Sequence, residues 1–156
     1  MHAPTTRDRS FHGRLVRRHV GVTRQGDVAV LGTEFDLILA SRDAVIGVAL
    51  DVWMVVPDWK RGVSNHLNQP GANFSALADH VDHIVQVTGT TENVGIGTDL
   101  DGGYGAEQSP SDLDTIADLK LFVEILRQRG YDDEAIQGIC HLNFIQFLCT
   151  IQIKWG

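Results

Sequence analysis

The chain has 156 residues and a formal net charge of −7, with 43% hydrophobic and 21% charged residues. This length is typical of one domain, and the hydrophobic content is sufficient for a buried core, which argues against a disordered chain. No apolar run approaches the roughly 18–20 residues that a membrane-spanning helix needs. The composition therefore predicts a globular protein without a membrane span.

The charge is unevenly distributed along the chain. Residues 1–30 contain six arginines and two aspartates, a balance of +4, so the remaining residues carry −11. An arginine-rich arm can bind nucleic acid, but this one contains no lysine, almost no aromatic residues and no helical periodicity. We expect residues 1–32 to form a disordered leader, or one that fits the domain poorly, and we expect no nucleic-acid binding.

Cys140 and Cys149 are the only cysteines, and both lie in one apolar helical stretch. Nine helical residues separate them by roughly 13 Å, which is too far for a disulfide within that helix. We interpret them as core thiols of a protein in the reducing cytoplasm. The N-terminal residues also lack the apolar core and cleavage site of a secretory signal.

Regular patterning begins near residue 33. Thr33 can cap a helix that runs through Ala40. The segment Ala44–Leu50 is apolar on both faces and rich in β-branched residues, which is typical of a buried parallel strand. The long connection Val52–Asn73 follows, and loops of such length in compact domains are usually binding loops or lids.

A second helix and strand follow the long connection. The apolar spacing predicts a helix over Phe74–Thr88, with Asn73 as its N-cap and Gly89 just past its end. Asn93–Thr98 then forms a second buried strand.

Two further helices complete the pattern. Ser111 can cap the first, which ends near Gly130, and Asp132 or Asp133 can start the last, which runs through Leu148. The alternation of apolar strands with helices indicates an α/β fold with parallel strands covered by helices. Two strands cannot close a barrel, so we expect the fold to be incomplete as an independent barrel.

In parallel β/α folds, ligands bind beyond the carboxyl ends of the strands. Asp51 and Asp99 directly follow the two predicted strands, and Asp101 and Gly102 lie in the glycine-rich turn after the second. A carboxylate there could bind a metal, take a proton from a metal-bound water or hold a substrate ammonium group. The alternative is a turn in which Asp99 or Asp101 only caps local backbone amides, and the spacing alone leaves both interpretations open.

The long connection carries other polar and aromatic candidates. His66 could approach a ligand from this loop, although the sequence indicates no partner for it. Trp53 and Trp59 are more typical of loop anchors that cover the core than of residues that stack on a substrate.

Four motifs in order define a family resemblance: an aspartate-histidine repeat over Asp79–His83, the strand end Gly97–Gly102, the turn Arg129–Tyr131 and the pair Asn143–Phe144. Together they resemble the C-terminal region of the membrane dipeptidase (renal dipeptidase-like) metallopeptidases over about residues 33–148.

The resemblance implies a partial (β/α)₈ TIM-type barrel made of the last strands and their flanking helices. It divides the chain into a leader (1–32), the barrel portion (33–150) and a tail (151–156). It also implies a hydrolase of dipeptides in which a binuclear zinc site activates a bridging water. Asp99 then contributes acid/base catalysis and contacts the amino end of the substrate, and Asp101 holds the turn. Gly102 and Asp51 are expected to bind substrate or to be structural.

The zinc ligands of the family are a His-x-Asp pair on the first strand, a bridging glutamate and two later histidines, and we can place none of them in this chain. His80 and His83 share a helix face, but zinc needs at least one further ligand, so we interpret them as packing or surface residues. We therefore predict no metal ligands here and no dipeptidase activity of the chain alone. The alternative is a non-catalytic module whose exposed strand edges pair with another chain, by self-association or with the missing half of the barrel.

Overall fold

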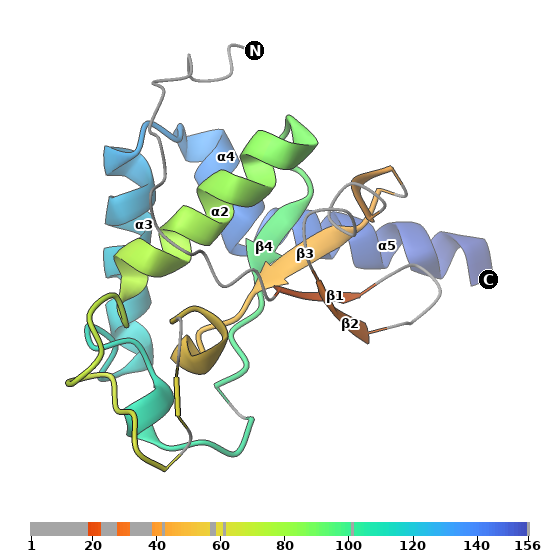
Figure 1. Ribbon diagram of the computed structural model, residues 1–156. Coiled ribbons are helices and arrows are strands. Elements are labelled where there is room, and N and C mark those ends of the chain that lie inside the picture. Colours follow the sequence, from red (N-terminus) through yellow and green to blue (C-terminus); the bar gives the residue numbers. More distant parts are fainter. Residues whose placement is uncertain are drawn as a thin grey trace.

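The computed structural model describes residues 19–22, 28–31, 39–41, 43–56, 59–60, 62–100 and 102–155 (Figure 1). The strands are β1 (His19–Val22), β2 (Val28–Leu31), β3 (Val45–Val48) and β4 (Val94–Ile96). The α-helices are α2 (Phe74–Thr88), α3 (Leu119–Gln128), α4 (Asp133–Gln137) and α5 (Asn143–Trp155). Short helical turns are η1 (Val52–Met54), η2 (Ala106–Gln108), η3 (Ile116–Asp118) and the π-helical segment Gly138–Leu142. Of the helix predicted after Thr33, only residues 39–40 lie among the described residues, and they are helical.

The strands form one four-stranded sheet in the order β2-β1-β3-β4. The predicted parallel pair is confirmed, with Ile46 opposite Val94 and Val48 opposite Ile96 in β3 and β4. Part of residues 1–32 differs from the expected disorder, because β1 and β2 form an antiparallel hairpin and β1 pairs with β3. Valine-rich segments favour strands, and an antiparallel pair needs only a short connection. The sheet is therefore mixed, and its described strands do not close into a barrel.

Local capping sets the ends of α2 as the sequence predicts. The Asn73 side chain accepts a 3.1 Å hydrogen bond from the backbone N–H of Ala76. Gly89 has the left-handed φ of 76° that glycine adopts without strain, and its N–H donates to the carbonyl of Val85. A second acceptor comes from far along the chain, since the Asp112 carboxylate accepts a 3.0 Å hydrogen bond from the N–H of Phe74.

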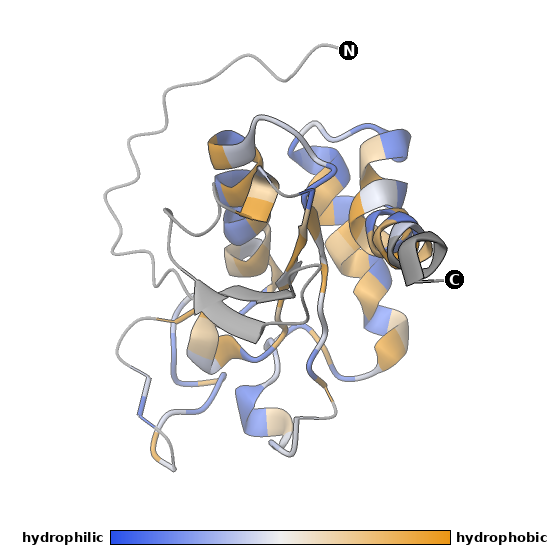
Figure 2. Ribbon diagram, turned by 90° about the vertical axis from the view of Figure 1, so that its right-hand side faces the viewer, coloured by the Kyte–Doolittle hydropathy of each residue, from blue (hydrophilic) through white to orange (hydrophobic). Residues whose placement is uncertain are grey.

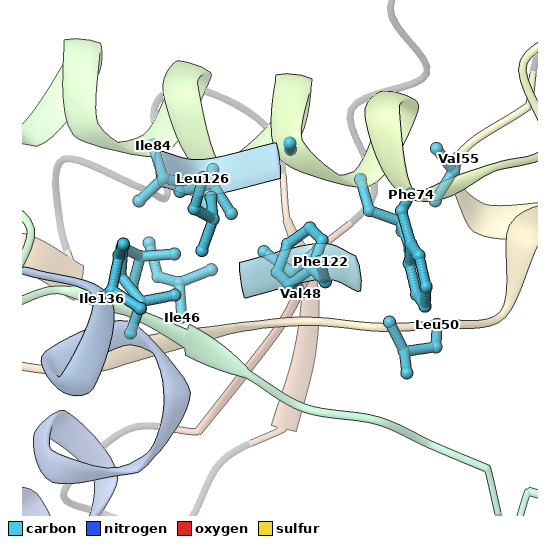
Figure 3. Close-up of a cluster of buried hydrophobic side chains, with 14 of the residues drawn as sticks. Ile46, Val48, Leu50, Val55, Phe74, Ile84, Phe122, Leu126 and Ile136 are labelled. Carbon is cyan, nitrogen blue, oxygen red and sulfur yellow. The ribbon is translucent and has the colours of Figure 1, made fainter. Parts of the chain in front are cut away.

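The hydrophobic core lies between the helices and one face of β3 and β4. Ile46, Val48 and Leu50 alternate along β3 and its continuation, and all are buried. They meet Phe74 and Phe122 of α2 and α3, whose ring centroids are 5.6 Å apart (Figure 3). Figure 2 shows the same arrangement as hydrophobic colour on the central strands and on the helical surfaces turned toward them.

The start of the third predicted helix differs from the prediction. Helical structure begins with η3 after Thr115 rather than at Ser111, because the Asp118 carboxylate accepts hydrogen bonds from the Thr115 N–H (2.7 Å) and hydroxyl (3.0 Å). These bonds, first of all the backbone one, lower the pKa of Asp118. The N–H of Ser111 instead donates to the carbonyl of Ala72, which ties this segment to the long connection.

The predicted last helix is one continuous helical region from Asp133 to Trp155, in which a π-helical segment separates α4 from α5. Of the two candidate start residues, Asp132 caps α4, and its carboxylate accepts from the N–H of Ala135 at 2.8 Å. The π-helical segment Gly138–Leu142 then interrupts the α-helical hydrogen-bond pattern before α5. A Cβ on Gly138 would lie 2.9 Å from Oδ1 of Asn143, so the absence of a side chain there leaves room for the Asn143 amide.

Asn143 connects this interruption to the sheet. It is buried, and its Nδ2 donates to the carbonyls of Thr91 (2.7 Å) and Val94 (2.8 Å). The ring of Phe144 packs directly over Gly95, since a Cβ at Gly95 would lie 2.5 Å from it. The Asn143–Phe144 motif therefore positions α5 against β4.

Both cysteines are free thiols, but only one is shielded. Cys140 is half-buried, and burial raises the pKa of its thiol. Cys149 is exposed, so its prediction as a core thiol is wrong. It lies two residues from the buried Phe147, which places it on the opposite side of the helix. Within the described part of the chain, no helix combines the length and hydrophobicity needed to cross a membrane.

The aspartate-histidine repeat and the Arg129–Tyr131 turn contact each other. Arg129 Nη1 lies 2.7 Å from Asp79 and 2.5 Å from Asp82, and its Nη2 donates to the Ser75 carbonyl at 2.8 Å. Although burial lowers the pKa of Arg129, the hydrogen bonds to both carboxylates raise it above its ordinary value. The Tyr131 hydroxyl donates to Asp82, and burial followed by the Asp82 charge raises the pKa of Tyr131. Two motifs of the family resemblance thus join α2 to the turn between α3 and α4.

His80 lies on the buried side of α2 and is 2% exposed. Burial, and to a smaller extent the neighbouring His83, lowers the pKa of His80 to about 4. The folded state therefore holds His80 neutral at a pH where the unfolded chain, with an ordinary pKa near 6.5, becomes protonated.

Replacing Arg129 with alanine should lower the free energy of unfolding by about 2 kcal/mol, because it leaves two partly buried carboxylates without their shared cation. Arg127→Ala is the matched control, since its pairs with Glu124 and Asp133 are solvent-exposed, and its effect on the free energy of unfolding should be clearly smaller. Urea unfolding of both variants measures the difference. Equal costs would show that the Arg129 contacts do not join α2 to the turn.

His80 should make the protein less stable as the pH falls. Its contribution is fully present above pH 6.5 and is lost between pH 6.5 and about 4, for a total of about 3 kcal/mol. Urea unfolding at pH 7, 5.5 and 4 should therefore show a smaller pH dependence in His80→Gln than in the wild type. His141→Gln, at an exposed position, is the control and should keep the wild-type dependence. A wild-type slope in His80→Gln would contradict the prediction.

Candidate functional site

The two predicted strand-end aspartates emerge side by side. Parallel pairing continues past the strands, because the N–H of Gly97 donates to Val48 and the N–H of Leu50 donates to Thr98, both at 3.0 Å. Asp51 and Asp99 are therefore the next residues after these neighbouring strands, at the end of the sheet where the loops after β3 and β4 lie (Figure 1). A pocket of about 320 Å³ lies there, and its lining residues are Asp51, Trp53, Met54, Asp99, Gly102, Gly103, Tyr104 and Gln108.

Asp51 has a local structural contact. It is 3% exposed, and its Oδ1 accepts a hydrogen bond from the N–H of Trp53 at 3.2 Å, which caps η1. This contact fixes the direction in which the chain leaves β3. The predicted contact of Asp51 with a substrate stays a prediction.

Asp99 occupies an uncommon backbone conformation, with a left-handed φ of 55° that aspartate tolerates better than most residues. The turn is closed by a 2.9 Å hydrogen bond from the N–H of Gly102 to the Asp99 carbonyl. A Cβ on Gly102 would lie 2.8 Å from Oδ1 of Asp99, so glycine leaves room for the carboxylate at this position. Asp101 lies outside the described residues. The catalytic role of Asp99 stays a prediction.

Sequence reasoning missed Tyr104 and Gln108 as pocket residues. The signal available was their position just after the glycine-rich turn at a strand's carboxyl end. The two tryptophans divide between the predicted alternatives: Trp59 packs against the small cluster of Val52, Val56 and Ala72, whereas Trp53 lines the pocket.

His66 contacts protein backbone rather than standing alone in the loop. Its backbone N–H donates to the Glu107 carbonyl, and its ring Nδ1 lies 2.9 Å from the Ser109 carbonyl. With the bond from Ser111 to Ala72, these contacts dock the long connection on the segment that carries η2. The two loops that form the pocket therefore support each other.

The described residues do not fit a complete zinc site. Among them, no group of three or more histidine, cysteine, aspartate or glutamate side chains is placed to hold a metal ion. The pocket brings together two carboxylates, from Asp51 and Asp99, whereas zinc sites in proteins use three or four ligands. His80 and His83 lie away from the pocket on α2, where His80 is packed in the core.

A larger cavity of about 630 Å³ lies near the amino ends of β3 and β4, where Val45 and Asn93 contribute to its lining. It contains none of the predicted site residues. The candidate site is thus the smaller pocket at the carboxyl ends.

Comparison with known proteins gives matches to dipeptidases. Mouse Dipeptidase 3 is 36% identical over 81 residues, which cover 52% of this chain and 16% of the mouse protein. Dipeptidase verJ of Clonostachys rogersoniana is 33% identical over 76 residues, or 49% of this chain and 19% of that protein. The chain thus spans less than a fifth of the length of these curated relatives.

Solved structures share the fold. A metallopeptidase from Rhodobacter sphaeroides, bound to a phosphinate mimic of the dipeptide L-Ala-D-Ala, superposes with a TM-score of 0.59 at 19% identity. The superposition covers 74% of this chain and 30% of that chain. A second solved structure, a dipeptidase of the M19 metallopeptidases, gives the same TM-score, and the superposition covers 31% of that chain.

The model of the membrane dipeptidase family matches residues 35–153, which is well over half of the chain. The resemblance predicted from the four motifs is confirmed, and the chain belongs to the membrane dipeptidases, peptidase family M19.

Proposed function

We propose that this chain forms the Asp99 side of a metal-dependent dipeptidase site and carries the last strands of the family's barrel. The observation that supports it is the pocket in which parallel β3 and β4 bring Asp51 and Asp99 together, in a chain of the dipeptidase family. We also propose a cytoplasmic location, on the ground that both cysteines are free thiols.

The charge of the pocket favours the amino end of a dipeptide. Among the described residues, its lining includes two carboxylates and no lysine or arginine. An ammonium group is therefore attracted and a carboxylate repelled, in a partly desolvated space where such interactions strengthen. Asp99 has the exposure to receive this ammonium or to exchange a proton with a reacting group, whereas Asp51 is buried and occupied in capping.

The described residues supply no complete metal site. Family membership implies metal use by the whole enzyme, with zinc as the proposed ion. We therefore propose that the chain alone does not hydrolyse dipeptides and acts together with polypeptide that provides the metal ligands.

A zinc-supplemented assay with L-Ala-D-Ala and other dipeptides tests this proposal. The purified chain alone should give no turnover. Addition of a polypeptide that carries the remaining part of the Rhodobacter sphaeroides barrel should restore turnover. In that mixture, Asp99→Asn should lower the rate at least about 100-fold, because it removes a group able to exchange a proton. Asp114→Asn, at an exposed position outside the pocket, is the control and should keep the rate.

Three outcomes would contradict the proposal. Robust turnover by the chain alone, abolished by Asp99→Asn, would overturn the expected inactivity. A restored rate that Asp99→Asn leaves unchanged would refute the role of Asp99. Stable binding of the two parts without any turnover would refute a dipeptidase site.

A second candidate function is a module that pairs with another chain, and the edge of β4 favours it. Asn93 and Gly97 use their carbonyl and N–H toward β3, so the backbone groups of Val94 and Ile96 point to the other side. Among the described strands the sheet order ends at β4, although Asn143 occupies the Val94 carbonyl on this edge. A further strand can add at this edge.

Self-association is the form of pairing to test, because α5, whose Asn143 binds this edge, also exposes Ile145 (50%) and Leu148 (57%). Light scattering should give a mass above the 17.2 kDa monomer that rises with concentration. Leu148→Glu should reduce it, whereas Leu121→Glu on α3, also exposed, should not. A monodisperse monomer at every concentration would exclude this function.

A further inference from the structure

Gln108 is a pocket residue with a buried acceptor. Its side chain lines the pocket beside Asp51 and Asp99, and its Oε1 atom is shielded from solvent. No hydrogen-bond donor reaches this oxygen from the part of the chain that the structure describes. Buried polar atoms in folded proteins are almost always hydrogen-bonded, so an orphan of this kind requires a donor from elsewhere. A ligand in the pocket is one source.

The backbone around Gln108 is held in place on both sides. Its own N–H donates to the Gly105 carbonyl at 3.0 Å, which closes η2. The carbonyls of its two neighbours, Glu107 and Ser109, both contact His66, through the His66 N–H and Nδ1 at 2.9 Å each. The backbone at this residue is thus fixed by a distant loop, which lowers the entropy cost of ordering the residue on binding.

The chemistry of the pocket selects the kind of donor. An α-ammonium group carries a positive charge and three N–H donors that point in different directions. The Asp99 carboxylate supplies a negative charge and can accept hydrogen bonds from some of these N–H groups. Oδ1 of Asp51 already accepts a hydrogen bond from the backbone N–H of Trp53. A neutral acceptor at Gln108 complements the remaining N–H without adding a third carboxylate.

We infer that Gln108 is a specificity-determining residue that accepts a hydrogen bond from the free amino end of a peptide substrate. The inference rests on the proposed function, because it assigns a further contact to the same site. It predicts that peptides whose amino group is blocked lose the benefit of Gln108.

Titration of the full-length chain with L-Ala-D-Ala and N-acetyl-L-Ala-D-Ala, followed by the NMR amide signals of Gly102 and Gly103, tests this inference. The wild type should bind the free dipeptide more tightly than the acetylated one. Gln108→Met removes the acceptor at similar length, and it should weaken binding of the free dipeptide about tenfold while leaving the acetylated one unchanged. Gln108→Glu, which keeps an acceptor, should restore binding of the free dipeptide. Gln128→Met, at an exposed position on α3, is the control.

The outcomes separate this inference from the proposed function. If Asp99→Asn weakens binding and Gln108→Met does not, the inference is wrong and the proposed function stands. If Gln108→Met weakens both peptides equally, Gln108 acts through pocket shape and not through the amine, which also overturns it. If the wild type shows no saturable shift, the inference is wrong, and the restored-turnover assay decides the proposed function separately.

Discussion

The parallel pairing of β3 and β4 is the constraint on which the site depends. Parallel strands end at the same edge of a sheet, and the hydrogen bonds from Gly97 to Val48 and from Leu50 to Thr98 keep this pair in register to its end. Asp51 and Asp99 are the first residues released from that register. A one-residue slip would turn their side chains to opposite faces, so the pocket exists only because the register is fixed.

Two motifs of the family hold this register from outside the pocket, and Arg129, Tyr131 and Asn143 are not among the described residues that line it. Arg129 and Tyr131 bind the aspartates of α2, which fixes the helix that covers Ile46 and Val48. Asn143 binds the carbonyl of Val94 on the far side of β4. One contact fixes the helical layer over the strand pair, and the other fixes the edge of the pair.

Sequence patterns predicted the features that depend on neighbouring residues. The Asn73 cap and the Gly89 end of α2 are local, and both strand positions follow from buried β-branched runs. The start of α3 was misplaced because a competing acceptor at Asp118 and a distant carbonyl at Ala72 decide between Ser111 and Thr115. Gln108 was not predicted for the same reason, since the backbone around it is held by His66, about forty residues away in the chain. Partners that distant leave no periodic signal in a single sequence.

The two carboxylates of the pocket differ in burial and in the contacts that they make. One carboxylate, Asp51, is buried and occupied in shaping the loop after β3, whereas Asp99 is half-exposed in a turn that Gly102 keeps open. A buried carboxylate that caps a helical turn fixes the local backbone, whereas a carboxylate that solvent can reach remains available to a ligand. The loops on either side are joined by His66, so the acceptor at Gln108 and the carboxylate of Asp99 belong to one supported unit. Such a unit fits the amine recognition proposed above. Among the described residues, those that line the pocket do not form a group of three or more that could hold a metal ion.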